Sequence, residues 1–202
     1  MAALLEPDPG YGLWAETYPP FAHNELMRVE EKAMSALWKG LPAARALDIG
    51  TGTGRNLLLL ESQGVECLGL DRSPAMLKRA AGKLVRGDAC ALPFATGTFD
   101  LVLSSLMAGD VADLPRVFRE AARVLRRGGS FVYSDFHPLW AERGWERTFA
   151  SGDGRKWRLP YHPHALSEHR AALAAASLDT VTLEEPHLSG TPVLVVVRAM
   201  KS

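Results

Sequence analysis

The stretch that decides the fold of this 202-residue chain is residues 46–57, which read A-L-D-I-G-T-G-T-G-R-N-L. An apolar run leads to the acid Asp48, three glycines alternate at Gly50, Gly52 and Gly54, and a second apolar stretch follows. This pattern predicts a buried strand, a tight turn without side chains in the way, and the start of a helix. Open α/β sheets bind their ligands at such a turn, at the carboxyl end of a parallel strand. We therefore expect a ligand to lie against bare backbone here.

The spacing of the glycines narrows the choice of ligand. A dinucleotide fingerprint, G-x-G-x-x-G, would place its third glycine at Arg55, one residue after Gly54. A P-loop would need Gly-Lys-Ser/Thr after four spacer residues, and the stretch has no such sequence. An acid two residues before the first glycine would repel the pyrophosphate of a dinucleotide, because both are negatively charged. The same acid would attract a cationic ligand. The pattern therefore disfavours a nicotinamide-dependent oxidoreductase.

The G-x-G-x-G pattern with its leading acid resembles motif I of the class I S-adenosylmethionine-dependent methyltransferases. The resemblance continues in order through L-G-L-D-R-S (68–73), G-D-A-C-A-L-P-F (87–94), F-D-L-V-L-S-S (99–105) and R-V-L-R-R-G-G (123–129). It is close over residues 11–135 and looser in the C-terminal third, and it is nearest to the small-molecule, type 11-like members. It implies S-adenosylmethionine as the cofactor and S-adenosylhomocysteine as the product.

Strand and helix patterns alternate along the chain, which predicts a doubly wound, Rossmann-like α/β fold. Asn24 and Ser73 are expected to cap helices, since each stands before an apolar-periodic run. An amphipathic helix is expected over Asp113–Arg127, with a basic last turn and Gly128-Gly129 at its end. The family resemblance implies a seven-stranded sheet whose last strand is antiparallel. The expected C-terminal elements are a helix over 166–178 capped by Ser167 and strands over 180–183 and 193–197.

We expect a single methyltransferase domain over residues 1–202, in four parts. These are an N-terminal cap segment with its helix (1–40), the cofactor-binding core (41–135), a substrate lid (136–166) and a C-terminal helix with strands (167–202). Within the lid, residues 147–158 with a glycine turn at 151–154 predict a β-hairpin. The aromatic side chains of the lid favour a flat or apolar acceptor and the exclusion of water. The alternative is that they form a cluster on the core or a dimer contact.

Composition fits a soluble enzyme and gives no sign of a polyanionic partner. The chain has 23 basic and 23 acidic residues, so no bulk charge attracts nucleic acid or an anionic membrane. It has no apolar stretch long enough to span a bilayer, and its first residues lack the pattern of a secretory signal. Cys67 and Cys90 are expected to be reduced thiols. These features predict a cytoplasmic protein with a small-molecule acceptor, without a membrane or nucleic-acid partner, and leave its oligomeric state open.

The cofactor site is predicted from spacing and from the family resemblance together. Asp71 lies about twenty residues beyond the glycine turn, where an acid can accept hydrogen bonds from ribose hydroxyls. The resemblance implies that Asp48 lies near the methionine end, Asp88 near the adenine, and Tyr18 or Tyr11 over the cofactor. Each of these side chains has a plain structural alternative, such as a turn acid or an aromatic anchor. The full predicted set is Tyr11, Tyr18, Asp48, Gly50, Thr51, Gly52, Gly54, Asp71, Arg72, Asp88, Ala89, Ser104 and Ser105.

The implied reaction is a direct displacement, in which an oxygen, nitrogen, sulfur or carbon atom of the acceptor attacks the sulfonium methyl in line and S-adenosylhomocysteine leaves. A general base is needed only when the acceptor must lose a proton, and histidine suits neutral pH. His137 is the first choice because it follows the fifth predicted strand, and His162 and His164 come after it. The alternative, a metal site built from these three histidines and Asp135, is disfavoured. No carboxylate cluster typical of magnesium sites is evident, so no metal is expected.

Two absences narrow the acceptor further. No Asn/Asp-Pro-Pro-Tyr/Phe motif follows the fourth strand, where residues 104–107 read S-S-L-M, which counts against methylation of exocyclic amines. Neither cysteine follows a proline, which counts against a covalent cytosine mechanism. The preferred function is a small-molecule methyltransferase. The alternatives are a protein- or RNA-directed methyltransferase and a non-catalytic partner that binds S-adenosylmethionine.

Overall fold

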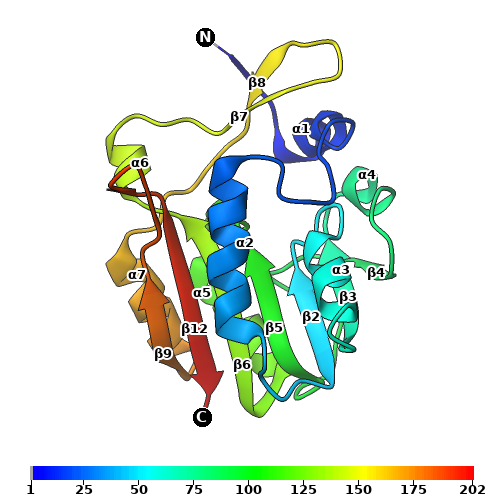
Figure 1. Cartoon of the computed structure of the whole chain (residues 1–202), viewed down its shortest axis with the longest axis vertical. Coiled ribbons are helices and arrows are strands. Elements are labelled where there is room, and N and C mark those ends of the chain that lie inside the picture. The colour runs from blue at the N-terminus through cyan, green and yellow to red at the C-terminus, as the bar shows by residue number, and fades with distance from the viewer. Residues whose placement is uncertain (1) are drawn as a thin grey trace.

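Seven strands form one mixed sheet in the computed structural model, which describes residues 2–202 (Figure 1). Across the sheet they are β4 (Lys83–Arg86), β3 (Glu66–Asp71), β2 (Arg45–Ile49), β5 (Phe99–Ser105), β6 (Leu125–Phe136), β12 (Leu194–Lys201) and β9 (Leu178–Glu184). The first five run parallel, whereas β12 is antiparallel to both of its neighbours. The predicted doubly wound sheet with an antiparallel last strand is confirmed. Met1, where the predicted N-terminal segment begins, lies outside the described residues.

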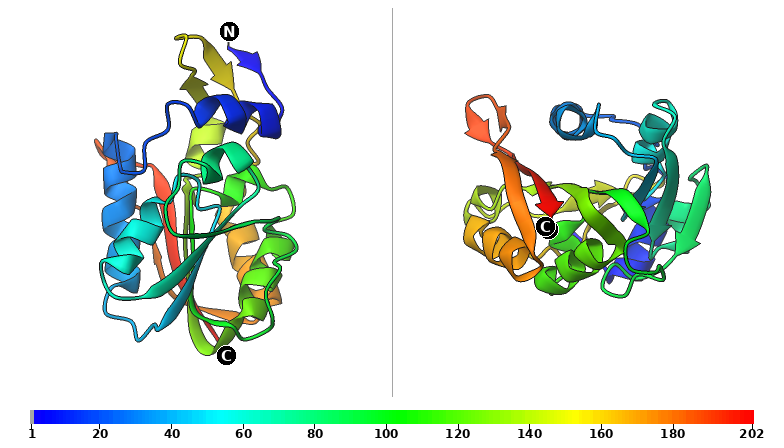
Figure 2. Two further views of the ribbon diagram at one scale, coloured as in Figure 1. Left: turned by 90° about the vertical axis from the view of Figure 1, so that its right-hand side faces the viewer. Right: turned by 90° about the horizontal axis from the view of Figure 1, so that it is seen from below.

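Helices cover both faces of this sheet. The helices α2 (Glu25–Trp38) and α3 (Arg55–Glu61) lie on one face, and α5 (Leu114–Val124) and α7 (Leu166–Ala175) lie on the other (Figure 2). Because side chains alternate along a strand, each central strand contributes to two cores. In β2, for example, Ala46 packs in the core under α2 and α3, whereas Leu47 and Ile49 pack in the core under α5. Burial on both faces explains why these strands are almost continuously apolar.

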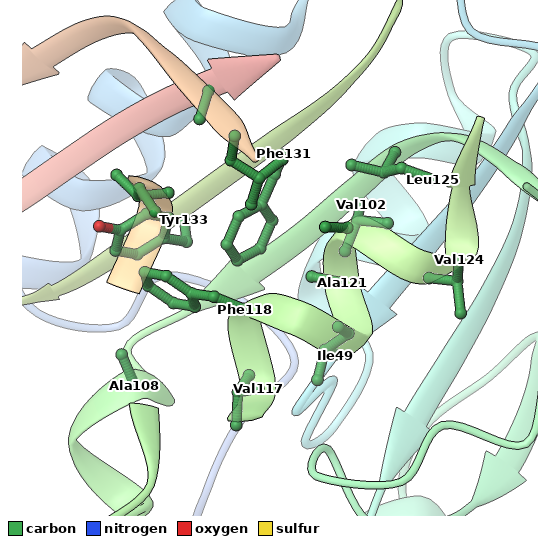
Figure 3. Close-up of a cluster of buried hydrophobic side chains, with 14 of the residues drawn as sticks. Ile49, Val102, Ala108, Val117, Phe118, Ala121, Val124, Leu125, Phe131 and Tyr133 are labelled. Atoms are coloured by element: carbon green, nitrogen blue, oxygen red, sulfur yellow. The ribbon is translucent and has the colours of Figure 1, made fainter. Parts of the chain in front are cut away.

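Aromatic side chains fill the core under α5. Phe118 of α5 lies against Phe131 and Tyr133 of β6, with ring centroids 5.2 and 4.8 Å apart (Figure 3). All three side chains are almost completely buried. Offset and edge-on aromatic pairs of this kind add to the free energy gained from burial. These contacts hold α5 against the sheet beside β5. The end of β5 forms part of the cavity described below.

The predicted helix starts at Asn24 and Ser73 are confirmed. The backbone N–H of Met27 donates to Asn24 Oδ1 at 2.8 Å, which caps α2. The backbone N–H of Met76 donates to Ser73 Oγ at 3.3 Å, which caps the short helix α4 (Pro74–Leu77). Each bond satisfies a donor that the first turn of a helix leaves free.

The predicted end of the amphipathic helix is wrong. The helix α5 ends at Val124 and not at Arg127. Leu125 takes up an extended conformation, with ψ 140°, and buries its side chain completely, so that it already belongs to β6. Burial of one leucine therefore outweighs the favourable charge of a basic last turn. The two glycines that we expected at the helix end, Gly128 and Gly129, lie within β6, where Gly128 has a φ of +74°.

The predicted cap and end of the last helix are also wrong. The N-cap position of α7 is Ala165 and not Ser167, and the Glu168 carboxylate accepts a hydrogen bond from the Ala165 N–H at 2.6 Å. Alanine has no side-chain oxygen to cap the helix, and the Glu168 side chain, from the first turn, provides the hydrogen bond at the helix start instead. The helix ends at Ala175 because Ser177 takes a φ of +55°, which turns the chain into β9.

A small unit lies beyond the carboxyl ends of the parallel strands (Figures 1 and 2). It consists of β1 (Ala3–Leu4), α1 (Pro7–Trp14), β7 (Thr148–Ala150) and β8 (Lys156–Arg158), and β8 pairs with both other strands. We call residues 3–18 and 147–159 the cover. The β-hairpin predicted over residues 147–158 is confirmed, and its role as a substrate lid stays a prediction. The sequence did not predict α1, which contains two glycines, poor helix formers.

The remaining elements are short. They are η1 (Ala108–Asp110), α6 (Leu139–Glu142), β10 (His187–Leu188) and β11 (Thr191–Pro192). Within residues 2–202, no helix has both the length and the apolar character needed to cross a membrane.

Candidate functional site

A cavity of about 570 Å³ lies between the carboxyl ends of the parallel strands and the cover. Its volume is within the usual range of small-molecule sites, ~300–1,000 Å³. The glycine turn, the ends of β3 and β5 and the segments 23–27 and 145–148 contribute to its walls. Most of the predicted cofactor residues line it: Tyr11, Tyr18, Gly50, Thr51, Gly52, Asp71, Arg72, Asp88, Ala89 and Ser105. Asp48, Gly54 and Ser104 are not among the residues that line it.

The glycine turn requires glycine for two different reasons. Gly50 has a φ of +71°, and a Cβ there would lie only 2.5 Å from the Cγ of Met107. Gly52 has a φ of +56°, but a Cβ there would meet nothing within 4 Å. The left-handed conformation alone disfavours a side chain at Gly52, and the space beside it is open. The turn thus presents bare backbone to the cavity, as predicted.

Asp71 is fixed by two backbone donors. Its Oδ1 accepts from the N–H of Ser73 and its Oδ2 accepts from the N–H of Gly52, both at 2.8 Å. Burial raises the pKa of Asp71 above its usual value, and the two backbone hydrogen bonds partly oppose that shift. Each carboxylate oxygen can accept more than one hydrogen bond, so capacity remains for ligand hydroxyls. The geometry therefore suits an acid that receives a diol.

Asp48 lies behind the glycine turn and does not reach the cavity surface. It is 1% exposed, and Asn56 Nδ2 donates to its Oδ1 and to Ser105 Oγ, both at 2.9 Å. Burial raises the pKa of Asp48 to about 6, and its Oδ2 has no hydrogen-bond partner among residues 2–202. Asn56, which the sequence analysis missed, thus ties the ends of β2 and β5 together. Ser104 is buried on β5, and in the described part of the chain its hydroxyl has no hydrogen-bond partner.

Three further predicted residues lie at the more open end of the cavity. Asp88 is exposed, and its Oδ1 accepts from the N–H of Cys90 at 2.8 Å. Ala89 follows it in the wall. The exposed Arg72 pairs with Asp8 of α1 at 3.0 Å. This end of the cavity therefore has an acid, Asp88, next to a small side chain, Ala89. Like Asp71, both residues lie near the carboxyl ends of the strands.

The predicted histidines do not line the cavity. His137 Nε2 lies 2.9 Å from Glu185 Oε2, and the His164 ring lies 2.9 Å from the carbonyl oxygen of Val111. His162 is exposed. Within residues 2–202 no group of three or more histidine, cysteine or acidic side chains could hold a metal ion, so these histidines and Asp135 do not converge.

One histidine that the sequence analysis missed does line the cavity. His23 stands between the cover and α2, and its ring packs edge-on against Tyr18 with centroids 5.7 Å apart. Its neighbours along the chain form no known motif, so only the path of the folded chain reveals it.

A buried ion pair on the cavity wall was also missed. Tyr11 donates its hydroxyl to both carboxylate oxygens of Asp110, at 2.8 Å each, and Arg147 pairs with the same carboxylate. Arg147 also donates to the carbonyl oxygen of Leu106 at 3.1 Å, and its guanidinium lies 5.7 Å from the ring centroid of Trp14. Burial raises the pKa of Asp110, and Arg147 partly opposes that shift. No local pattern marks these residues, because their chain segments meet only in the fold.

A second buried network fixes the end of β5. Arg55 Nη2 and Ser134 Oγ each donate to the Glu30 carboxylate at 2.6 Å. The N–H of Leu106 in turn donates to the carbonyl oxygen and to the hydroxyl of Ser134, both at 3.1 Å. Leu106 has a φ of +55°, which is unfavourable for a leucine and needs such support. The network therefore holds a strained backbone segment at the cavity wall.

Comparisons with known proteins agree with this geometry. The model of the family described as "Methyltransferase domain" matches residues 47–133. The biotin biosynthesis bifunctional protein BioHC of Cellvibrio japonicus is 34% identical over 147 residues, which are 68% of this chain and 29% of that protein. The demethylmenaquinone methyltransferase of Mycolicibacterium gilvum is 40% identical over 98 residues, 47% of this chain and 43% of that protein. The chain thus spans less than half the length of either relative.

A solved structure matches over a larger share of its length. The S-adenosylmethionine-dependent methyltransferase of Mesorhizobium loti superposes with a TM-score of 0.73 at 25% identity. The match covers 86% of this chain and 98% of that one. With the glycine turn, the anchored Asp71 and the seven-stranded sheet, these matches show that the chain belongs to the class I S-adenosylmethionine-dependent methyltransferase family.

Proposed function

We propose that this protein binds S-adenosylmethionine in the cavity and methylates a small, uncharged acceptor. The observation that carries the proposal is the pairing of an open glycine turn with Asp71, whose carboxylate is fixed by the turn itself at 2.8 Å. A nucleoside on this turn would meet bare backbone, and its ribose diol would meet a fixed acceptor of hydrogen bonds.

The other predicted residues fit this cofactor in distinct ways. Asp71 accepts from the ribose hydroxyls, and Asp88 with Ala89 forms the adenine end of the site. Asp48 acts from behind the turn, where its unpartnered Oδ2 favours a positive charge nearby. Tyr18 and Tyr11 line the cavity from the side of the cover, and residues 136–166 serve as the substrate lid.

When bound, S-adenosylmethionine would supply an activated methyl group, whose carbon the acceptor's lone pair would attack in line while the carbon–sulfur bond breaks and S-adenosylhomocysteine leaves. The residues of this chain then have only to align the two reactants and exclude water. Alignment alone can contribute roughly 7–11 kcal/mol in favourable systems. The rigid backbone at Leu106, held by Ser134 and Arg147, suits a wall against which an acceptor is positioned.

The end of the cavity where the acceptor would bind has aromatic walls, and its arginine side chains are paired with acids. Its walls include Trp14, Tyr18, Met107, Phe136 and Trp145. The two arginines of this wall are already paired, Arg147 with Asp110 and Arg55 with Glu30. An anionic acceptor would find both guanidinium groups already paired with carboxylates and would lose its hydration, which is costly, and a cationic acceptor would be repelled by the sulfonium of the donor. We therefore infer a flat, uncharged acceptor, a class that also fits the printed name of the demethylmenaquinone methyltransferases among the relatives.

Where the acceptor must lose a proton, we propose His23 as the general base. It lines the cavity, whereas His137 is paired with Glu185 outside the lining. That His137, His162 or His164 serves as the base stays a prediction from the sequence, and none of the three is among the residues that line the cavity.

Two measurements test the proposed function. In thermal unfolding, 1 mM S-adenosylmethionine or S-adenosylhomocysteine is expected to raise the melting temperature, and 1 mM NAD is expected to leave it unchanged. Formation of S-adenosylhomocysteine is then measured with matched acceptors, such as catechol against 3,4-dihydroxybenzoate, and faster turnover is expected for the uncharged member. Equal stabilisation by NAD would contradict the cofactor, and preference for carboxylates would contradict the acceptor class.

A further inference from the structure

The two segments of the cover are tied to each other, although they lie far apart in the sequence. The strand β1 pairs with β8, and the N–H of Leu5 donates to the carbonyl oxygen of Arg158 at 2.9 Å. Thr17 Oγ1 donates to the carbonyl oxygen of Ala150 at 3.1 Å. Trp14 stacks on Phe149, with ring centroids 5.1 Å apart. The cover is therefore one body made from two pieces of chain, as Figure 1 shows above the sheet.

Both segments meet the sheet at a single carboxylate. Asp110 ends η1, a few residues after β5. Tyr11, from the first segment, donates to both of its oxygens at 2.8 Å, and Arg147, from the second segment, forms an ion pair with it. Arg147 also donates to the carbonyl oxygen of Leu106 at the end of β5. One acidic side chain thus joins three parts of the cavity wall.

This contact is better protected from water than the Arg72–Asp8 ion pair, which also joins the cover to the rest of the protein. The side chains of Asp110 and Arg147 are 22% and 8% exposed. The Arg72–Asp8 pair is 67% and 64% exposed, and pairs exposed to that extent stabilise little. Hydrogen bonds to a charged group are stronger than neutral ones, and burial strengthens them further. Asp110 is therefore the main polar anchor of the cover.

The cover forms one wall of the cavity. Tyr11, Trp14 and Arg147 all line the cavity, opposite the glycine turn. A ligand on the turn would be covered on one side by this wall, so movement of the wall would widen its way out. The strength of the interaction of Asp110 with Tyr11 and Arg147 then determines how often the cover moves away from the cavity.

We propose that Asp110 is a positioning residue that holds both segments of the cover over the cavity and thereby slows the release of a bound cofactor. The ligand in this proposal rests on the function proposed above, but the anchoring of the cover does not. Asp110 touches Tyr11 and Arg147, and through them it positions the aromatic wall.

The first test uses S-adenosylhomocysteine as the probe and tryptophan fluorescence as the signal, because Trp14 and Trp145 line the cavity. Stopped-flow mixing gives its association and dissociation rates. Asp110→Asn is expected to raise the dissociation rate about tenfold, the change that corresponds to losing one charge-assisted hydrogen bond. Tyr11→Phe, which keeps the ion pair and the ring, is expected to give a smaller increase. The amplitude of the fluorescence change per mole of protein should not fall, as it would if part of each variant were misfolded.

The matched control is Asp153→Asn. Asp153 is an exposed acid at the tip of the same hairpin, and its contacts are to Ser151 and Arg155 within that turn. Its rates should equal those of the unmodified protein. Equal dissociation rates for the unmodified protein, Asp110→Asn and Tyr11→Phe would overturn the proposal.

The second test needs no ligand. Hydrogen–deuterium exchange of the free protein should be faster in Asp110→Asn over residues 3–18 and 147–159 together, with the exchange of β2 and β5 unchanged. Unchanged exchange in either segment would overturn the anchoring role. Should the unmodified protein fail to bind S-adenosylhomocysteine, the proposed function would fail, while exchange would still decide the role of Asp110.

Discussion

The backbone N–H of Gly52 donates to Asp71 Oδ2 at 2.8 Å, which joins the glycine turn after β2 to the end of β3. The two features that identify the site in the sequence are therefore one hydrogen-bonded unit in the structure. A change at either residue should alter the other.

Asp71→Ala should weaken binding of S-adenosylhomocysteine. It removes an acceptor for the ligand and frees the N–H groups of Gly52 and Ser73, so we expect a loss of about 1.5–3 kcal/mol, the usual value of a hydrogen bond to a charged group. Isothermal titration calorimetry measures it. Asp179→Ala, at an exposed position of β9, is the control and should bind normally. Normal affinity of Asp71→Ala would remove this acid from the site.

Gly50→Ala should destabilise the fold more than Gly64→Ala. Both glycines have positive φ, 71° and 75°, but only at Gly50 would a Cβ meet Met107 at 2.5 Å. The shared conformational cost is about 1–2 kcal/mol, and the contact should add about 1–3 kcal/mol. Urea denaturation gives both free energies of unfolding. In a double-mutant cycle, Gly50→Ala should cost less free energy of unfolding in a Met107→Ala background than in the unmodified protein, and an equal cost in both would show that the contact is unimportant.

His23→Gln should lower turnover of a hydroxyl acceptor about 10²-fold or more while leaving cofactor affinity unchanged, because a positioned base contributes roughly 10²–10⁴-fold. His137→Gln, which breaks the contact with Glu185, should have a smaller effect on turnover. The rates are measured with the best acceptor from the matched panel. A larger loss in His137→Gln than in His23→Gln would reverse the assignment.

His169 should make the protein less stable in mild acid. Its side chain is completely buried and its Nδ1 lies 3.2 Å from the Tyr133 hydroxyl, and burial lowers its pKa to about 4 from 6.5. The unfolded chain therefore binds a proton that the folded chain does not, so the free energy of unfolding falls as pH falls from 6.5 towards 4, by on the order of 3 kcal/mol at most.

Urea denaturation at pH 7 and pH 5 measures this loss. His169→Phe cannot titrate at this position and keeps a ring to stack on Tyr133, so its free energy of unfolding should change less between the two pH values. An equal change in both proteins would show that His169 does not cause the loss.

Much of the fold could be predicted because its signals are local. A tight turn needs glycine at Gly50 and Gly52, a buried parallel strand needs an apolar run, and a helix start needs a cap such as Asn24. The helix ends were predicted less well. At Leu125, burial in the sheet decided the conformation, and no local pattern of charge reveals what a side chain will meet across the core.

The sequence by itself determined the class of fold, the glycine turn and Asp71, since the backbone conformation and the spacing of these residues follow from neighbouring positions. Only the tertiary structure decided that His23 and not His137 faces the cavity, and that Tyr11, Asp110 and Arg147 meet there. The physical reason is distance along the chain. A turn is fixed by interactions within a few residues, whereas the acceptor wall is assembled from segments that approach one another only when the sheet and the cover have formed.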